Sequence, residues 1–368
     1  MRLRTLTILA AALLVGAAPA ATAAEAGAPR MFTDPEAPGH GGFTVAPPTA
    51  ALLMAFHTCV SDCSTPKNHM IRLAQSADGA SWSEVAGWQP YSGSVPDVFR
   101  RGSTVYVVGT GISKIDLASG RVTAHRISTK RADGSNAMPR DVSFAGQLDD
   151  GRLVIVYVPP MSEVSPGATQ YRIHLAVEKA GSDGTAFEWA ADALTVDRAA
   201  LQVQGEPTDP DIFWNGAAWV LYVSVGSNVL SFTSPSLLGP YSPSTQSVVS
   251  RDQGGVPSGI QAPDGSVMTF VNFGGFGTST TSIRRAVSPN GISGVGAFVE
   301  VLAPGPLGAS TAESPGVSLN VAGKACGAGC ASTAPVRAGA ACPAAGQTAK
   351  VGKRTLTCRK VGKRLVWR

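Results

Sequence analysis

The sequence predicts an all-β fold: a five-bladed β-propeller followed by a small, disulfide-pinned C-terminal β-module. Gly and Pro are the first reason, because 42 Gly and 26 Pro among 368 residues suit many short strands joined by tight turns. The second is a strand–turn–strand theme that recurs about five times, with no convincing amphipathic helix between residues 25 and 303. Since 44% of the residues are hydrophobic, the chain can build a sizeable core, which excludes wholesale disorder.

Residues 1–24 have the pattern of a secretory signal peptide. Arg2 and Arg4 precede a short apolar run, and small residues follow at Ala18-Pro-Ala20 and Ala21-Thr-Ala23. No later run approaches the roughly 18 apolar residues of a transmembrane helix. We therefore expect a secreted, extracellular protein without a membrane span.

The repeat defines a predicted propeller domain over residues 25–305. Each unit begins with a polar or Pro-Asp step, continues into an apolar strand, turns, and returns in a second strand rich in β-branched or aromatic residues. The predicted strand pairs are Met31–Pro35 with Ala51–Phe56, Val95–Phe99 with Thr104–Gly109, Pro139–Phe144 with Leu153–Val158, Asp209–Phe213 with Trp219–Ser224, and Val256–Ile260 with Val267–Val271.

The turn residues and the length of each repeat indicate the kind of unit. Asp-Gly and Asn-Gly steps favour hairpins, because both central residues of the turn must tolerate positive φ. Five units over some 280 residues give about 55 residues each, which is the size of a four-stranded blade. A β-sandwich with long loops is the alternative fold, but a sandwich would not require the unit to repeat.

The charge is divided unevenly along the chain. Ten basic residues and no acidic residue lie from Lys324 onward, and two more basic residues lie in the leader. The main body contains the other 18 basic residues and all 25 acidic residues. Its net charge is therefore about −7, although the whole chain carries +5. Residues 306–323 are expected to be a linker and residues 324–368 a basic, Cys-rich β-module. Since the body is acidic and the tail lacks interleaved aromatic residues, we expect no nucleic-acid partner.

Six cysteines in an exported chain indicate disulfides. They fall in sequence as three pairs, and the connectivity of the last four stays open, with a four-Cys zinc site as an alternative for these four. The cysteines are Cys59, Cys63, Cys326, Cys330, Cys342 and Cys358. The tail has three short β-forming segments that predict a meander held by the cysteines.

The tail resembles the Cys- and Lys-rich hairpin modules at the C-termini of secreted actinobacterial proteins. Binding to an anionic cell-wall polymer is one interpretation of its charge. A solvated β-module without a partner is the other.

The main body resembles the five-bladed propeller glycosidases, glycoside hydrolase family 43 and its clan relatives. The resemblance lies in Asp34-Pro35, in Arg140-Asp-Val-Ser-Phe with its following Asp-Asp-Gly-Arg, in Pro-Asp-Ile-Phe with Asn-Gly and Trp, and in Ser76-Ala-Asp-Gly-Ala-Ser-Trp82. It covers about three-quarters of the chain. It implies a secreted hydrolase that cleaves arabinofuranosyl or xylosyl side chains of polysaccharides with axial carboxylates.

The same resemblance implies catalytic roles for three residues. Asp34 would be the general base, Asp141 the residue that tunes the acid, and Glu206 the general acid, with separations of 107 and 65 residues, close to two blades and one. The family acid usually stands in a Glu-small-Pro step just before a strand. Here Glu206 is followed directly by Pro207, so it is offset, and Asp209 or Asp211 could take the inward position.

Further residues are candidates for sugar binding: Asp97, Asp209, Asp211, His57 and Trp214. Capping of local backbone amides is the alternative role for the aspartates, and packing is the alternative for His57 and Trp214. We expect no cofactor and no metal-dependent hydrolase, because the five histidines form no H-E-x-x-H motif. Whether calcium lies on the axis stays open. We expect a monomer.

Two other functions remain as alternatives. One is a non-catalytic propeller that binds a polysaccharide or the cell wall. The other is a sialidase-like enzyme, suggested by the turn at Ser76–Trp82, but a sialidase needs six blades.

Overall fold

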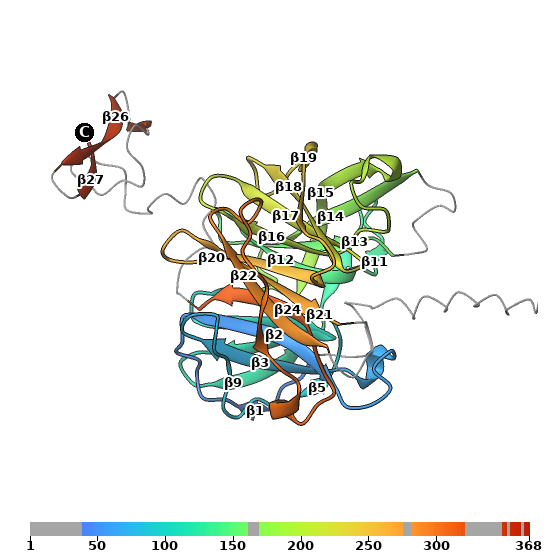
Figure 1. Ribbon diagram of the computed structural model, residues 1–368. Helices are drawn as coiled ribbons and strands as arrows, with labels where there is room; N and C mark the ends of the chain where they lie inside the picture. The colour runs from blue at the N-terminus through green and yellow to red at the C-terminus, as the bar shows by residue number, and fades with distance from the viewer. Residues whose placement is uncertain (1–38, 161–168, 275–280, 321–347, 352–353, 362–363) are drawn as a thin grey trace, which may run out of the picture.

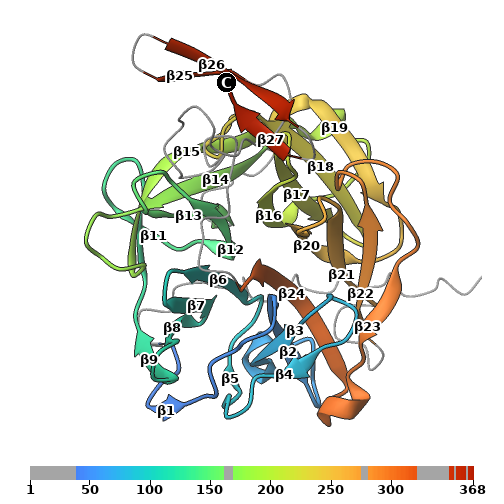
Figure 2. The ribbon, with the colours of Figure 1, turned by 90° about the vertical axis from the view of Figure 1, so that its left-hand side faces the viewer.

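The computed structural model describes residues 39–160, 169–274, 281–320, 348–351, 354–361 and 364–368. Five sheets stand radially around one axis, which confirms the predicted five-bladed propeller (Figures 1 and 2). Their strand pairs are antiparallel except for one parallel pair in the third sheet. The described helices are three short 3-10 turns, η1 (Pro66–Asn68), η3 (Arg198–Ala200) and η4 (Gly305–Leu307). None of the helices in these ranges is long and apolar enough to cross a membrane.

Each blade is a sheet whose strands follow one another from the axis outward. Blade I contains β24 (Thr311–Leu319), β2 (Leu52–Cys59), β3 (Met70–Ser76) and β4 (Ser83–Glu84), with β5 (Tyr91–Ser92) also on β3. Blade II contains β6 (Asp97–Arg101), β7 (Thr104–Gly109), β8 (Gly111–Asp116), β9 (Arg121–His125) and β1 (Phe43–Thr44). Blade III contains β12 (Arg140–Gln147), β13 (Leu153–Val158), β14 (Gln170–Glu178), β15 (Ala186–Asp197), β10 (Ser128–Lys130) and β11 (Asn136–Ala137). Blade IV contains β16 (Thr208–Trp214), β17 (Trp219–Val225), β18 (Asn228–Ser234) and β19 (Ser242–Ser250). Blade V contains β20 (Gly255–Gln261), β21 (Val267–Phe273), β22 (Ser282–Ser288) and β23 (Val299–Leu302).

The predicted strand pairs of blades II to V are confirmed. In each blade the first two strands form an antiparallel hairpin, for example β16 with β17, whose ends meet at the Trp214–Trp219 pair. Residues 215–218 form the turn between these strands. Gly216 has φ 94°, and Asn215 Oδ1 accepts from the Ala217 and Ala218 amides, so the predicted Asn-Gly step lies within a four-residue turn.

Blade I closes differently from the prediction. Its innermost strand is β24, which pairs with β2 from Leu52↔Leu319 to Cys59↔Thr311, whereas the prediction placed Met31–Pro35 beside Ala51–Phe56. The predicted linker over residues 306–323 therefore contains a blade strand, and the propeller extends past residue 305. Pairing strands some 260 residues apart ties the end of the ring to its beginning and leaves no open gap between blades V and I.

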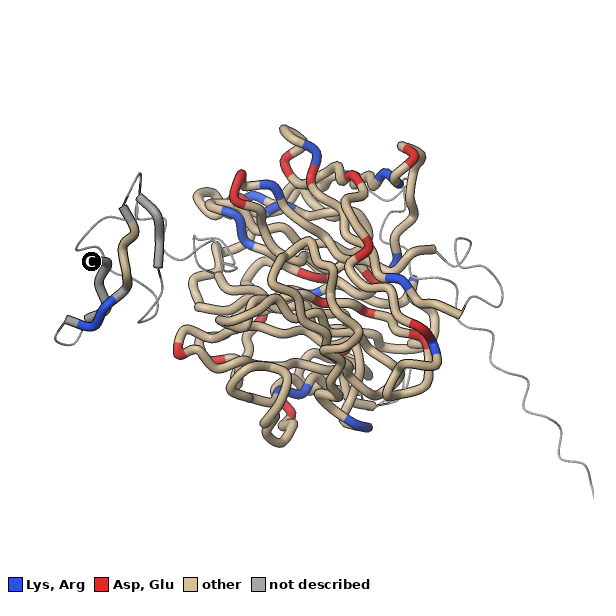
Figure 3. The backbone as a smooth tube through the Cα atoms, turned by 90° about the horizontal axis from the view of Figure 1, so that it is seen from above, with Lys and Arg blue, Asp and Glu red and all other residues tan. Residues whose placement is uncertain are grey.

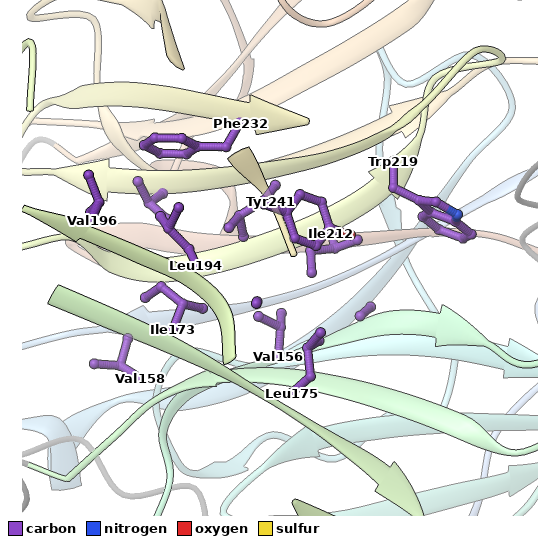
Figure 4. Close-up of a cluster of buried hydrophobic side chains, with 14 of the residues drawn as sticks. Val156, Val158, Ile173, Leu175, Leu194, Val196, Ile212, Trp219, Phe232 and Tyr241 are labelled. Carbon is purple, nitrogen blue, oxygen red and sulfur yellow. The ribbon is translucent and has the colours of Figure 1, made fainter. Parts of the chain in front are cut away.

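Apolar side chains fill each interface between neighbouring blades. Five clusters lie between blades I and II, II and III, III and IV, IV and V, and V and I. Figure 4 shows the cluster between blades III and IV, where Val156 and Leu175 from blade III pack near Ile212, Phe232 and Trp219 from blade IV. The strand β13 packs against blade IV with one face and against blade II with the other, so Leu153–Val158 is a continuous apolar run.

The five inner strands share an unusual backbone feature near their beginnings. One non-glycine residue in each has φ between 47° and 54°: Val95, Asp141, Asp209, Val256 and Ser314. We call this residue ring position one and count along the strand from it. Four of these strands also have a bulge in their pairing at this place. Left-handed φ is a genuine outlier for a β-branched residue such as Val95, so this conformation is held by the surrounding ring.

The C-terminal segment forms a separate three-stranded antiparallel sheet of β25 (Thr348–Val351), β26 (Arg354–Val361) and β27 (Arg364–Trp367). The predicted signal peptide and the side chains of Cys326, Cys330, Cys342 and Cys358 lie outside the described residues. Cys59 and Cys63 do form the predicted disulfide, with Cα atoms 5.6 Å apart.

Candidate functional site

Hydrogen bonds between neighbouring inner strands show that these strands all run in the same direction along the propeller axis, so the two ends of the axis can be distinguished. Ring position three holds Asp97, Ser143, Asp211, Ser258 and Gly316 in the five blades. Asp97 Oδ2 accepts from the Phe144 amide at 2.6 Å, Asp211 Oδ2 from the Gly259 amide at 2.7 Å, and Ser258 Oγ from the Val317 amide at 3.0 Å. Each donor amide belongs to ring position four of the next blade, so the inner strands run in the same direction and in register. We call the end where these strands begin the mouth, and the other end the far end.

Three nearly buried carboxylates lie where inner strands begin at the mouth. Asp141 and Asp209 occupy ring position one in blades III and IV, and Glu313 directly precedes ring position one in blade I; their exposed fractions are 7%, 9% and 1%. Thr208 Oγ1 donates to Asp209 Oδ2 at 2.7 Å. Gathering carboxylates from different blades at one end of the axis is the arrangement that hydrolysis by an acid and a base requires.

Glu313 faces a buried pair of histidines. His57 Nε2 lies 3.5 Å from Glu313 Oε2, and the His57 ring stacks on His69 with centroids 4.1 Å apart. The Val95 amide donates to His57 Nδ1 at 3.4 Å, so in neutral His57 the proton stands on Nε2, facing Glu313. Both histidines are fully buried, so His57 packs beside Glu313, which agrees with the packing role given above as the alternative to sugar binding.

His69 is in turn held by its own two hydrogen bonds. Its Nδ1 lies 2.8 Å from Ser94 Oγ and its Nε2 lies 2.9 Å from the Cys63 carbonyl. The carbonyl belongs to the small loop closed by the Cys59–Cys63 disulfide. The disulfide loop thus supports the histidine pair that backs Glu313.

Glu206, the predicted general acid, lies in the segment before β16 and not on the strand. Its side chain is 40% exposed, and its Oε1 lies 3.3 Å from Arg140 Nη2. Arg140 also donates through Nε to the Pro159 carbonyl and directly precedes Asp141. Glu206 therefore lies near the mouth between blades III and IV, as the partner of Arg140.

Asp97 and Asp211 lie deeper in the ring and connect blades through their hydrogen bonds to the Phe144 and Gly259 amides. Burial raises the pKa of Asp97 from 3.8 to about 7. Burial, and next the neighbouring charge of Asp97, raise the pKa of Asp211 well above its usual range. These aspartates, expected to bind substrate, instead join blade II to blade III and blade IV to blade V.

Trp214 lies at the far end, away from the mouth. It ends β16, packs edge-on against Trp219 with centroids 5.6 Å apart, and lines a half-open cavity of about 110 Å³. The expected sugar-stacking role would therefore place the sugar at the end of the axis opposite Asp141 and Asp209.

Sequence reasoning missed Glu313, although a signal for it was present. The triplet Glu313-Ser314-Pro315 is a Glu-small-Pro step, the pattern associated with the family acid, and it lies near the beginning of β24. The linker-like composition of residues 306–323 hides this signal. Asp34, the predicted base, lies outside the described residues.

The described part of the chain contains no group of three or more His, Cys, Asp or Glu side chains that could hold a metal ion. Acidic and basic residues are interspersed over the propeller surface (Figure 3).

The chain gives no significant match to any protein-family profile or to any curated protein. Its fold is similar to solved structures of family 43 glycoside hydrolases. One is the GH43_1 enzyme from Xanthomonas citri complexed with xylose, at 14% identity and a TM-score of 0.48, covering 68% of this chain and 89% of that one. Another is an endo-1,4-β-xylanase from Bacteroides thetaiotaomicron, at 15% identity and a TM-score of 0.44, covering 72% and 99%.

A third is an exo-β-1,3-galactanase from Phanerochaete chrysosporium, at 11% identity and a TM-score of 0.43, covering 60% of this chain. This chain spans 53% of that galactanase. At these identities the likeness concerns the fold.

Proposed function

We propose that this propeller is a glycoside hydrolase that cleaves arabinofuranosyl or xylosyl side chains of polysaccharides by acid–base catalysis at the mouth. The observation that carries the proposal is the placement of Asp141, Asp209 and Glu313 at the beginnings of three inner strands. The resemblance of the sequence to the family 43 glycosidases supplies the substrate class.

In this proposal Glu313 is the general acid. It stands in the Glu-small-Pro step, at the beginning of an inner strand, with the Nε2 atom of His57 3.5 Å from its carboxylate. Glu206 meets none of these conditions, since it lies before the strand and pairs with Arg140. His57 would position the Glu313 carboxyl group.

The general base is then an aspartate. Asp209 is the candidate within the described residues, Asp34 is the alternative that the resemblance implies, and Asp141 would tune the acid. Inversion of configuration would require the acid and the base to stand roughly 6.5–9.5 Å apart, with water between them.

The test compares Glu313→Gln with Glu206→Gln, which removes a glutamate charge at the same mouth. A lost general acid costs about 10²–10⁴-fold in rate. The loss should be larger for aryl arabinofuranosides and xylosides with poor leaving groups than for dinitrophenyl glycosides, which leave without a proton. If Glu206→Gln shows this leaving-group dependence and Glu313→Gln does not, Glu206 is the acid. If all of the variants, including Asp141→Asn and Asp209→Asn, keep wild-type turnover, the mouth is not catalytic.

A second function, non-catalytic binding of a polysaccharide, is favoured by one observation. The three carboxylates at the mouth are at most 9% exposed, so few of their oxygens are open to a substrate. This function predicts retention on arabinoxylan without release of sugar, and weaker retention on cell walls when residues 324–368 are removed. The sialidase-like alternative requires six blades, and the ring has five.

We also propose that the protein is exported, on the strength of the pattern in residues 1–24. N-terminal sequencing of protein from culture supernatant should find a chain that begins near residue 25. Retention of the full-length chain inside cells would contradict export.

A further inference from the structure

The far end of the axis holds a cavity that the proposed hydrolysis does not use. It has a volume of about 110 Å³ and is lined by the last residues of all five inner strands. A cavity needs only about 10–15 Å³ to hold one water, and an engineered cavity of about 150 Å³ binds benzene. The far-end cavity therefore has room for a compact apolar group, in an interior that is otherwise closely packed.

Part of the cavity wall is apolar, and the rest includes polar side chains such as Gln261 and Ser318. Phe144, Ile212, Ile260 and Val317 line it from four different blades, and each is buried. Such walls favour the body of a small apolar ligand over a fully hydrated one.

One buried carboxyl group, that of Asp211, lines the cavity, and Asp97 acts on it from outside the lining. Asp211 is 6% exposed and Asp97 is 3% exposed. Within the ranges that the structure describes, neither carboxylate forms an ion pair, and each is held by a backbone amide of the next blade. Burial raises the pKa of both groups, and the neighbouring Asp97 raises the pKa of Asp211 further, so ionising Asp211 would be favoured by a cation placed beside it.

The rim carries the opposite charge. Arg100 lines the cavity, but its guanidinium group donates to the Asn320 carbonyl and side chain and to the Gly102 carbonyl. It is thus tied to the end of β24 and, among the described residues, forms no ion pair with Asp211. A second positive charge at the outer end of a ligand would meet Arg100 and be disfavoured.

We propose that the far-end cavity binds a small monoamine, with its ammonium group against Asp211 and a compact apolar body between the inner strands. Bound ammonium would supply the counter-charge that the buried carboxylates lack. This site is independent of the proposed hydrolysis, because it lies at the opposite end of the axis from Asp141 and Asp209.

The test measures binding of benzylamine to the full-length protein by ligand-observed NMR and calorimetry. Benzyl alcohol is the neutral probe of the same shape, and 1,4-bis(aminomethyl)benzene is the diamine probe. Benzylamine should bind saturably, and the alcohol and the diamine should each bind at least tenfold more weakly. No saturable binding of benzylamine, or equal binding of the alcohol, would overturn the proposal.

Two variants locate the site. Asp211→Asn keeps an acceptor for the Gly259 amide but removes the charge, and it should weaken benzylamine binding at least tenfold. Ala145→Leu fills the cavity and should abolish binding, with the melting temperature showing that the variant folds. Asp264→Asn is the matched control, because it removes an exposed carboxylate in the turn after β20 and should leave binding unchanged. Benzylamine binding that survives Asp211→Asn undiminished would refute the site.

Discussion

Replacing Asp97 by Asn should change how the stability of this protein depends on pH. Asp97 is 3% exposed and its Oδ2 accepts from the Phe144 amide of the next blade at 2.6 Å. Asparagine has the same shape, and its side-chain oxygen can accept the same hydrogen bond without carrying a charge. The variant therefore removes the cost of burying the ionised carboxylate together with its repulsion of Asp211.

The magnitude follows from the pKa of Asp97, which burial raises from 3.8 to about 7. Between these two pH values the folded protein binds a proton that the unfolded chain has released. The free energy of unfolding therefore falls as the pH rises through this window. Each unit of pKa difference is worth 1.36 kcal/mol, so Asp97 should remove about 4 kcal/mol between pH 4 and pH 7.

The assay is urea unfolding at pH 4.5, 6 and 8, followed by tryptophan fluorescence. Exposed aspartates such as Asp133 and Asp150 have lowered pKa values and act in the opposite direction, but they do so equally in both proteins. The informative quantity is thus the difference between Asp97→Asn and wild type. The free energy of unfolding of the variant, relative to wild type, should rise with pH. A cost of about 1–3 kcal/mol for burying the amide hydrogens of the introduced asparagine lowers this difference equally at every pH.

Asp264→Asn is the matched control, because the pKa of this exposed aspartate is lowered by its hydrogen bonds to Ser266. Its stability relative to wild type should not rise with pH. If the difference between Asp97→Asn and wild type is the same at pH 4.5 and pH 8, the argument from burial is refuted.

Three further predictions concern the packing of the ring. Gly316→Ala should destabilise the protein by more than about 2 kcal/mol in urea unfolding, because an added Cβ would lie 2.2 Å from Asp97 Oδ1 and 2.6 Å from its Cα. Ser258→Ala should cost about 1–3 kcal/mol, since the buried Val317 amide loses its acceptor. Leu221→Ala should cost about 2–5 kcal/mol in the same assay, because Leu221 is fully buried between blades III and IV.

Matched substitutions at open positions serve as controls for these three. Gly305→Ala meets no atom within 4 Å, Ser266 lies in an exposed turn, and Val299 is 51% exposed. Ala at each of these positions should change stability by less than about 0.5 kcal/mol. If a buried substitution and its control at an open position change the free energy of unfolding equally, the packing described for the inner strands and blade interfaces is contradicted.

The sequence alone determined the repeated hairpins of blades II to V. Alternating or continuous apolar strands and Asp-Gly or Asn-Gly turns are local signals, and each hairpin pairs residues that lie close together in the chain. For the same reason the small disulfide between Cys59 and Cys63 was predictable.

Only the tertiary structure decided which strand completes blade I. The inner edge of β2 is filled by β24, about 260 residues away, because the ring must close and the last strand reaches that edge. Apart from the Glu313-Ser314-Pro315 step, no local pattern distinguishes this strand from a Pro- and Ser-containing linker. Glu313 lies on β24, so it became a candidate site residue only when the structure placed this segment in the ring.

The roles of the blade aspartates likewise depended on the fold. Val95-Pro-Asp97 and Asp209-Pro-Asp211 look alike in sequence, and either aspartate of the second triplet could face a substrate. In the ring, Asp209 stands at the beginning of its strand near the mouth, whereas Asp97 and Asp211 accept amides from the next blade. A hydrogen bond between strands some 48 residues apart is fixed by the packing of whole blades, so a reading of neighbouring residues along the chain does not contain it.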